Sequence, residues 1–472
     1  MRLATLCESG RKLAVGACLT ILAMGSWPVF AQGNLARLDG LTELQQPTAT
    51  AVNVVCANFV ANGYAANLNG TPEERLFWSC RAMVQSANQL AGSGPTSNSL
   101  DISNEQLRTG VQAVSPVQMN AQKQIGMEAS KMNQLSSRLL GVRGGMRGFV
   151  VGANGLEVPS RNTQVARTQG LEGATGGGAA ADDPFGGRWG GFLNVGYSWG
   201  DVDQTSLQDA YDYGSWNLLA GADYRVSDSL VVGAAVSYSE TRSDYDLSLG
   251  RIKASTLGVA GYGSYYVDDW YVDGFVAYGA VDYDTTRNIF IPSNSGSPAI
   301  NASAIASPSG DQWSASIGIG RSFDVRSFTV TPTVRLVYMQ VENDAIVESE
   351  PDFGLGLAVE SRTIRSLQSV VGVKFSTVVS TQAAVLGPYF TAQWMHEFEN
   401  DSPSILSKYV NDPFNVTFAI PTATPTRDYA IVLAGTSATF PNDWSGFAQV
   451  SAALGLDNET NYGVVVGIRK QF

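Results

Sequence analysis

The sequence has little charge, little cysteine and a single histidine. Charged residues make up 15% of its 472 residues, and the formal net charge is -12. This charged fraction is low against roughly 25% in ordinary soluble domains, and the acidic balance provides no basic surface for nucleic acid. One histidine cannot build a histidine-based metal site, and no Cys-x-x-Cys pair occurs. We therefore expect no nucleic-acid partner, no metal and no cofactor.

Long hydrophobic runs are also missing beyond the N-terminal segment. That segment has a basic start, an apolar stretch over 13–24 and the small-residue pattern Val29-Phe-Ala31, as in a Sec signal peptide. The apolar stretch is too short for a membrane anchor. We therefore expect residues 1–31 to direct export through the Sec translocon and to be removed.

Two cysteines, Cys56 and Cys80, remain after that segment. Thr71-Pro-Glu-Glu74 has the residues of a helix start, and Cys80 follows on that helix, whereas Cys56 belongs to an earlier one. An oxidising compartment allows the two thiols to pair. The sequence predicts a small helical domain over 32–114, stapled by a Cys56–Cys80 disulfide, with a further short helix beginning at Ser103.

A longer helix is predicted next. Ser115-Pro-Val-Gln118 is a capping box, and the helix runs to about Arg143, a length of roughly 42 Å. Its surface is mostly Gln, Asn, Ser and Lys, which suits a polar tube better than a soluble core. We predict a pore-spanning helix within 115–147 and a Gly/Ala-rich linker over 148–188. There are two alternatives: the helix is an exposed linker helix, or the linker itself passes through the pore in place of the helix.

From Trp189 onward the chain alternates between apolar and polar residues. Leu218, Ala220 and Ala222, for example, interleave with Asn217 and Gly221, and residues two apart share one face of a strand. The pattern predicts about twelve strands: 189–203, 213–227, 230–246, 252–267, 270–287, 312–324, 328–345, 361–379, 385–399, 427–440, 444–457 and 461–472.

The connections between these strands alternate in length. Ser227-Asp-Ser229, Asp268-Asp269 and Pro441-Asn-Asp443 are tight turns, whereas 288–311 and 400–426 are long loops. Membrane barrels have this rhythm, with short periplasmic turns and long external loops, and a soluble β-sandwich has no reason for it. The predicted fold is a membrane all-β class: a twelve-stranded antiparallel transmembrane β-barrel over 189–472. Aromatic girdles are expected at the strand ends: Trp189, Tyr265, Tyr266, Trp270, Tyr271 and Trp444.

The last strand is predicted to close the barrel. Five apolar side chains lie on one of its faces, namely Tyr462, Val464, Val466, Ile468 and Phe472. In a barrel this face meets lipid, and pairing with the first strand removes the exposed edge. The alternative is the closing strand of a soluble sandwich.

The C-terminal region resembles the autotransporter β-barrel of type V secretion. The resemblance covers roughly 189–472 and depends on the strand rhythm, on Gly221-Ala-Asp-Tyr-Arg225, on Trp394-Met-His-Glu-Phe-Glu-Asn-Asp401 and on Phe472. It implies a Gram-negative outer-membrane location among lipid and lipopolysaccharide, a helix inside the pore, and a terminal strand read by the barrel-assembly machinery. Two departures are Lys470, where a hydrophobic residue is typical, and an N-terminal region too short for a β-helical passenger.

No catalytic motif accompanies this resemblance. No Gly-Asp-Ser block occurs, and the Gly-x-Ser-x-Gly match at Gly196-Tyr-Ser-Trp-Gly200 lies inside a predicted strand and not at the strand-to-helix turn of a nucleophile elbow. His396 also falls inside a predicted strand, as a structural residue. We expect no enzyme, but a monomeric translocator that carries or displays its own N-terminal region. The alternatives are a passive pore or adhesin-like barrel with a periplasmic N-terminal domain, and a surface hydrolase with a new kind of passenger.

Overall fold

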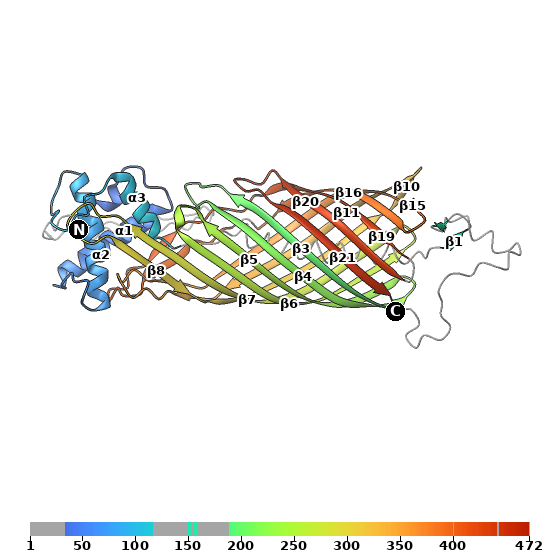
Figure 1. Cartoon of the computed structure of the whole chain (residues 1–472), viewed down its shortest axis with the longest axis horizontal. Coiled ribbons are helices and arrows are strands. Elements are labelled where there is room, and N and C mark those ends of the chain that lie inside the picture. Colours follow the sequence, from blue (N-terminus) through green and yellow to red (C-terminus); the bar gives the residue numbers. More distant parts are fainter. Residues whose placement is uncertain are drawn as a thin grey trace, which may run out of the picture.

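The structure is a computed structural model of the chain. It describes residues 34–116, 150–152, 155–157, 188–399, 401–440 and 443–471. Most of them form an elongated β-barrel with a group of helices at one end, and the chain's C-terminal strand ends at the other (Figure 1). No helix within these ranges has both the length and the apolar character needed to cross a membrane.

Twelve antiparallel strands form the closed wall. In chain order they are β3 (Trp189–Val202), β4 (Tyr211–Ser227), β5 (Leu230–Tyr245), β6 (Gly250–Val267), β7 (Trp270–Ile291), β9 (Ser309–Arg321), β11 (Phe328–Asn343), β14 (Arg362–Thr377), β16 (Val385–Glu397), β19 (Asp428–Thr439), β20 (Trp444–Leu454) and β21 (Tyr462–Gln471). Each pairs with the next, and β21 pairs with β3. The twelve predicted strands are confirmed, with boundaries that differ by a few residues.

Side-chain alternation explains why these segments form a barrel wall. On β5, Val236 and Tyr238 are exposed on the outer face, while Ala235 and Ser239 are buried on the inner face. The same alternation recurs on β4, where Asn217 is buried and Leu218 is exposed. An apolar outside with a polar inside is the pattern of a barrel surrounded by lipid.

Short connections gather at one end of the barrel, which we call the turn end. The predicted turn at Asp268–Asp269 joins β6 to β7, and Asp268 adopts a φ of 51°, a left-handed conformation that Asp tolerates. Three elements also belong near this end: β10 (Phe323–Val325), β15 (Val379–Ser380), and the hairpin of β1 (Val150–Gly152) with β2 (Gly155–Glu157). β2 contacts β15. This hairpin lies within 148–188, the region predicted as a Gly/Ala-rich linker, and the linker assignment stays a prediction.

Long connections lie at the opposite end, the loop end. They contain β8 (Ile300–Ala306), β12 (Ile346–Val347), β13 (Leu357–Val359), β17 (Ile405–Tyr409) and β18 (Phe418–Ile420), and the short η4 (Asp246–Ser248) joins β5 to β6 at the same end. β8 extends the wall by pairing with the far half of β7, and the other four strands form a small sheet in the order β12-β13-β17-β18. The sequence predicted long loops over 288–311 and 400–426, and within them the structure forms the additional strands β8, β17 and β18.

The helices precede the barrel in the chain. They are η1 (Leu35–Arg37), α1 (Gln45–Ala61), α2 (Pro72–Leu90) and α3 (Asn104–Ala113). Thr71 caps α2 and Ser103 caps α3, each in a reciprocal capping box with Glu74 and Gln106 respectively. These caps satisfy backbone N–H groups that a helix start leaves unpaired, and they confirm both predicted helix starts. We call residues 34–116 the cap.

Candidate functional site: a closed and capped barrel

The barrel closes along a seam between its last and first strands. Val464 pairs with Tyr197, Val466 with Val195 and Ile468 with Leu193. The side chains of Tyr462, Val466 and Ile468 are exposed on the outer face, that of Val464 is half-buried there, and Val465 points inward. The outward side chains form a row on the closing strand, and their role as an assembly signal stays a prediction. The remaining member of the predicted row, Phe472, lies outside the described residues.

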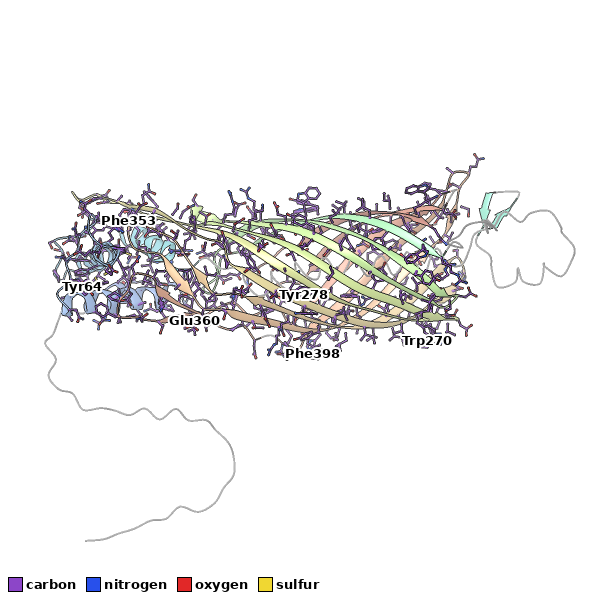
Figure 2. All side chains as sticks on the ribbon, turned by 90° about the horizontal axis from the view of Figure 1, so that it is seen from below. Tyr64, Trp270, Tyr278, Phe353, Glu360 and Phe398 are labelled. Carbon is purple, nitrogen blue, oxygen red and sulfur yellow. The ribbon has the colours of Figure 1, made fainter. Side chains whose placement is uncertain are left out.

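Aromatic side chains bracket an apolar band on the outer face. On β7, Trp270 lies at the turn end and Tyr278 near the middle of the molecule (Figure 2). Eight residues apart, they are separated by roughly 27 Å along the strand, which at a tilt of about 35–45° is a height of roughly 19–22 Å, somewhat less than the roughly 25 Å apolar band of an outer-membrane barrel. Tyr271 was predicted to belong to this girdle, but it is buried inside, because neighbouring strand residues face opposite sides.

Beyond this band the outer face becomes charged. Arg242 and Arg251 each lie 2.6 Å from Asp244, and Lys253 lies 3.1 Å from Glu240. All five side chains are exposed on β5 and β6, nearer the loop end than Tyr238. Charged pairs of this kind belong in water. The loop half of the barrel therefore projects out of the apolar band.

The lumen is lined by polar side chains that water scarcely reaches. Five of them, Asn217, Ser239, Thr256, Ser314 and Gln368, are exposed by only 1 to 4%. Nearer the turn end, Arg469 donates to Asp223 at 3.4 Å, and Ser264 donates to Asp273 at 2.7 Å. In an open barrel such inward groups face a water-filled channel, whereas here they are shielded from water.

At the loop end the cap packs on four connections that we call the mouth loops: 203–210, 292–308, 344–361 and 401–427 (Figure 1). One hydrophobic core runs through both parts. It contains Phe59, Phe77 and Leu107 of the cap together with Leu355 and Ile420 of the mouth loops. The loop end of β7 contributes Ile289 and Ile291 to the same core. Gly110 of α3 packs against Ile291 so closely that an added Cβ would lie 3.0 Å from it.

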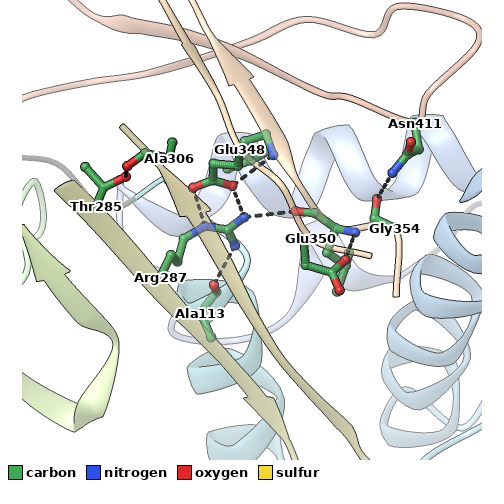
Figure 3. A network of polar contacts seen from close by, with 10 residues as sticks. Ala113, Thr285, Arg287, Ala306, Glu348, Glu350, Gly354 and Asn411 are labelled. Carbon is green, nitrogen blue, oxygen red and sulfur yellow. Dashed lines mark hydrogen bonds and ion pairs between the residues drawn. The ribbon is translucent and has the colours of Figure 1, made fainter. Parts of the chain in front are cut away.

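A buried arginine of the barrel wall contacts both a mouth loop and the cap (Figure 3). Arg287 of β7 donates through Nε to Glu348 at 3.0 Å and pairs with the same carboxylate through Nη2. Nη1 donates to the carbonyl of Ala113 in the last turn of α3, and Nη2 donates to that of Leu355, both at 2.9 Å. The side chains of Arg287 and Glu348 are only 2% and 9% exposed. The guanidinium thus holds barrel wall, mouth loop and cap together.

A second buried polar contact links the cap to the first mouth loop. Gln112 of α3 donates to the carboxylate of Asp209, and both side chains are buried. Burial raises the pKa of Asp209 to about 6, and the hydrogen bond from Gln112 partly opposes this shift. The carboxyl therefore titrates nearer neutral pH than an ordinary aspartate.

Comparison with known proteins identifies the barrel. The family profile described as the autotransporter beta-domain matches residues 191–451, more than half of the chain. The chain belongs to the autotransporter beta-domain family. Its barrel is therefore a translocator domain of the Gram-negative outer membrane, and barrels of this family are assembled by the β-barrel machinery.

Relatives of known name are similar over the same region. The chain is 28% identical over 245 residues to Autotransporter CRAC of Citrobacter rodentium, a match that covers 52% of this chain and 14% of that protein. The translocator domain of NalP from Neisseria meningitidis is 17% identical, with a TM-score of 0.48, over 61% of this chain and 89% of that one. The beta domain of the Bordetella autotransporter BrkA is 18% identical, with a TM-score of 0.43, over 60% and 100%.

The two cysteines lie together inside the cap of this autotransporter. Both are buried free thiols, Cys56 on α1 and Cys80 on α2. Burial raises the pKa of the Cys80 thiol well above its ordinary value, and the hydrogen bond with Cys56 adds to the rise. The two helices that were predicted to carry a disulfide are therefore adjacent, and the disulfide itself stays a prediction.

The histidine lies near the loop end of β16. His396 of β16 pairs through Nδ1 with Asp428 at 2.8 Å and stands between the rings of Trp394 and Phe398. Across the ranges that the structure describes, no three His, Cys, Asp or Glu side chains cluster in a way that could hold a metal ion. Sequence reasoning missed the Arg287 contacts, although an inward arginine near the end of a long strand was a visible signal.

Proposed function

We propose that this autotransporter delivers its own residues 34–116 to the outer surface and keeps them there as a docked cap. The observation that supports this most strongly is the position of the cap at the loop end. The first barrel strand begins, and the last one ends, at the opposite turn end. Since long loops are external and short turns periplasmic in outer-membrane barrels, the cap would be extracellular.

The path of the chain supports the same proposal. Pro116 leaves α3 at the loop end, and the β1–β2 hairpin contacts β15, which follows β14 at the turn end. The residues between 116 and 150 lie outside the described ranges, and they join the two ends. We propose that they cross the lumen as the predicted pore-spanning helix of 115–147. The burial of the lumen residues Asn217 and Thr256 supports this route.

The remaining parts of the proposal follow from export. Residues 1–31, also outside the described ranges, would direct the chain to the Sec translocon, and the barrel-assembly machinery would insert the barrel next to lipopolysaccharide. The 148–188 region would then be periplasmic. We propose a monomer that takes part in transport and display and has no catalytic role. Passage of the 148–188 linker through the pore, in place of the helix, is the alternative route.

A second candidate function is a passive pore or adhesin-like barrel with a periplasmic N-terminal domain. That arrangement requires residues 34–116 at the turn end, whereas they pack on the mouth loops. The hydrophobic core that the cap shares with the mouth loops favours display over this alternative.

Surface labelling of intact cells tests the proposal. An epitope placed between Gly63 and Tyr64 is suitable, because this connection is exposed and an added Cβ at Gly63 would meet no atom within 4 Å. A matched control carries the same epitope in the turn at Asp268–Asp269. Antibody binding to the first and not to the second, with both detected after lysis, is the expected result. Binding only after lysis for both would reject display.

A further inference from the structure

The hydrophobic core of the cap is continuous with that of the mouth loops. Phe59 of α1 stacks on Phe77 of α2 with ring centroids 5.2 Å apart, and Phe414 of the mouth loops meets Phe59 edge-on at 5.3 Å. Trp78 of α2 packs on Phe353, again from a mouth loop, at 6.1 Å. Rings from the barrel part of the chain therefore extend the aromatic cluster between the two main helices.

Backbone groups of the cap also find their partners on the barrel side. The carbonyl of Leu100 accepts from the N–H of Asn294 at 2.8 Å, and that of Asp101 accepts from the Asn294 side chain at 3.0 Å. The N–H of Leu44 donates to the carbonyl of Ser206 at 2.9 Å. Buried backbone groups in folded proteins are almost always paired. Without the mouth loops, these groups of the cap lose the partners they have.

Gly354 shows how closely the two parts fit. Its φ is 73°, and an added Cβ would lie 2.6 Å from the carbonyl oxygen of Pro72 and 2.7 Å from the nitrogen of Leu76. The first turn of α2 therefore rests directly on the backbone of the mouth loop, with no space for a side chain. The hydroxyl of Ser79, one turn further along α2, donates to the carbonyl of Phe353 at 2.9 Å.

We infer that the mouth loops are a folding template for the cap, and that residues 34–116 reach their fold only when docked on them. A unit as small as residues 34–116 buries a smaller share of its surface when packed alone than a larger domain does, and here the loops supply further rings and hydrogen-bond partners. The inference deepens the proposed function and depends on it for the place of docking, the outer surface.

Hydrogen exchange of the full chain in detergent tests the inference. Two loop variants remove different contacts: Gly354→Val displaces the start of α2, and Phe414→Ala removes a ring from the cluster. Although both substitutions lie in the barrel part, we expect the amides of α1 and α2 to exchange at least about tenfold faster in each variant. Amides of β4, β5 and β6 should keep the wild-type rate.

The matched control is Gly296→Val. It makes the same change in a mouth loop where an added Cβ meets no atom within 4 Å, and its cap should exchange like the wild type. If Gly354→Val fails to assemble, Phe414→Ala decides alone. Unchanged exchange of α1 and α2 would overturn the inference, as would an equal rise in the barrel strands. Neither result bears on the side of the membrane, which the surface epitope reports separately.

Discussion

Replacing Glu348 by glutamine should release the cap while leaving the barrel intact. Glutamine keeps the size of the side chain but removes the charge that faces Arg287, whose own side chain is only 2% exposed. Breaking a buried ion pair by removing one partner typically costs about 3–5 kcal/mol, because the other charge is left uncompensated. The carbonyls of Ala113 and Leu355 accept from the guanidinium, but they cannot replace a full negative charge.

Trypsin measures this loss directly. Arg75 and Arg81 lie within α2, so cleavage there requires the cap to open. When opening and closing are fast relative to cleavage, the cleavage rate follows the population of the open form. A loss of about 3–5 kcal/mol then corresponds to a rate increase from roughly a hundredfold to a few thousandfold. The assay uses folded protein in detergent, and heat-modifiable gel migration confirms that the barrel persists.

The control makes the same chemical change at an exposed pair. Glu240→Gln removes the partner of Lys253 on the outer surface, where both side chains are about 40% exposed (42% and 39%), and such pairs contribute about 0–1 kcal/mol. Its cleavage rate should stay close to that of the wild type. If Glu348→Gln is cut no faster than Glu240→Gln, the buried pair does not hold the cap, and the reasoning is refuted.

Three further predictions concern Asp209, Phe472 and the two cysteines of the cap. Burial in the docked state raises the pKa of Asp209 from 3.8 to about 6. The protonated carboxyl therefore stabilises the docked cap fully below about pH 4, and this stabilisation is lost as pH rises through 6. Asp209→Asn should remove this pH dependence and slow cleavage of the cap at pH 7, a gain of ~3 kcal/mol at most; equal pH profiles would contradict it. Deletion of Phe472 should lower outer-membrane levels and leave protease-sensitive periplasmic protein, whereas unchanged levels would count against the assembly signal. Alkylation of mature, unreduced protein should leave Cys56 and Cys80 unmodified if they form the predicted disulfide, and labelling of both after unfolding would reject it.

The barrel could be predicted because its information is local and repeats. Each strand alternates with a period of two, so Leu218 and Asn217 already show which face meets lipid, and the tight turn at Asp268 separates two such runs. Helix starts were equally accessible, since Thr71 and Ser103 recruit partners only three residues away. Local rules of this kind do not require knowledge of distant contacts.

The mouth of the barrel could not be predicted, because its contacts join segments far apart in the chain. The two-residue strand β12 (Ile346–Val347) is too short to show a period. β8 pairs with the mouth loop that contains β12 through a single bridge between Ile305 and Ser349. Likewise, nothing near Arg287 in the sequence points to Glu348 or to Ala113. Glycines such as Gly354 show their purpose only when α2 is seen against the loop. These contacts decide which end of the barrel carries the cap.

The conductance of single channels in planar bilayers tests the central claim most directly, namely that the chain fills and caps its own barrel. The comparison is between the full mature chain and a variant that lacks residues 33–147, with heat-modifiable migration confirming that both barrels fold. The account predicts that the full chain is closed or conducts weakly, and that the deletion raises the conductance, because the lumen around Asn217 and Thr256 then fills with water. Equal conductance with and without residues 33–147 would contradict it.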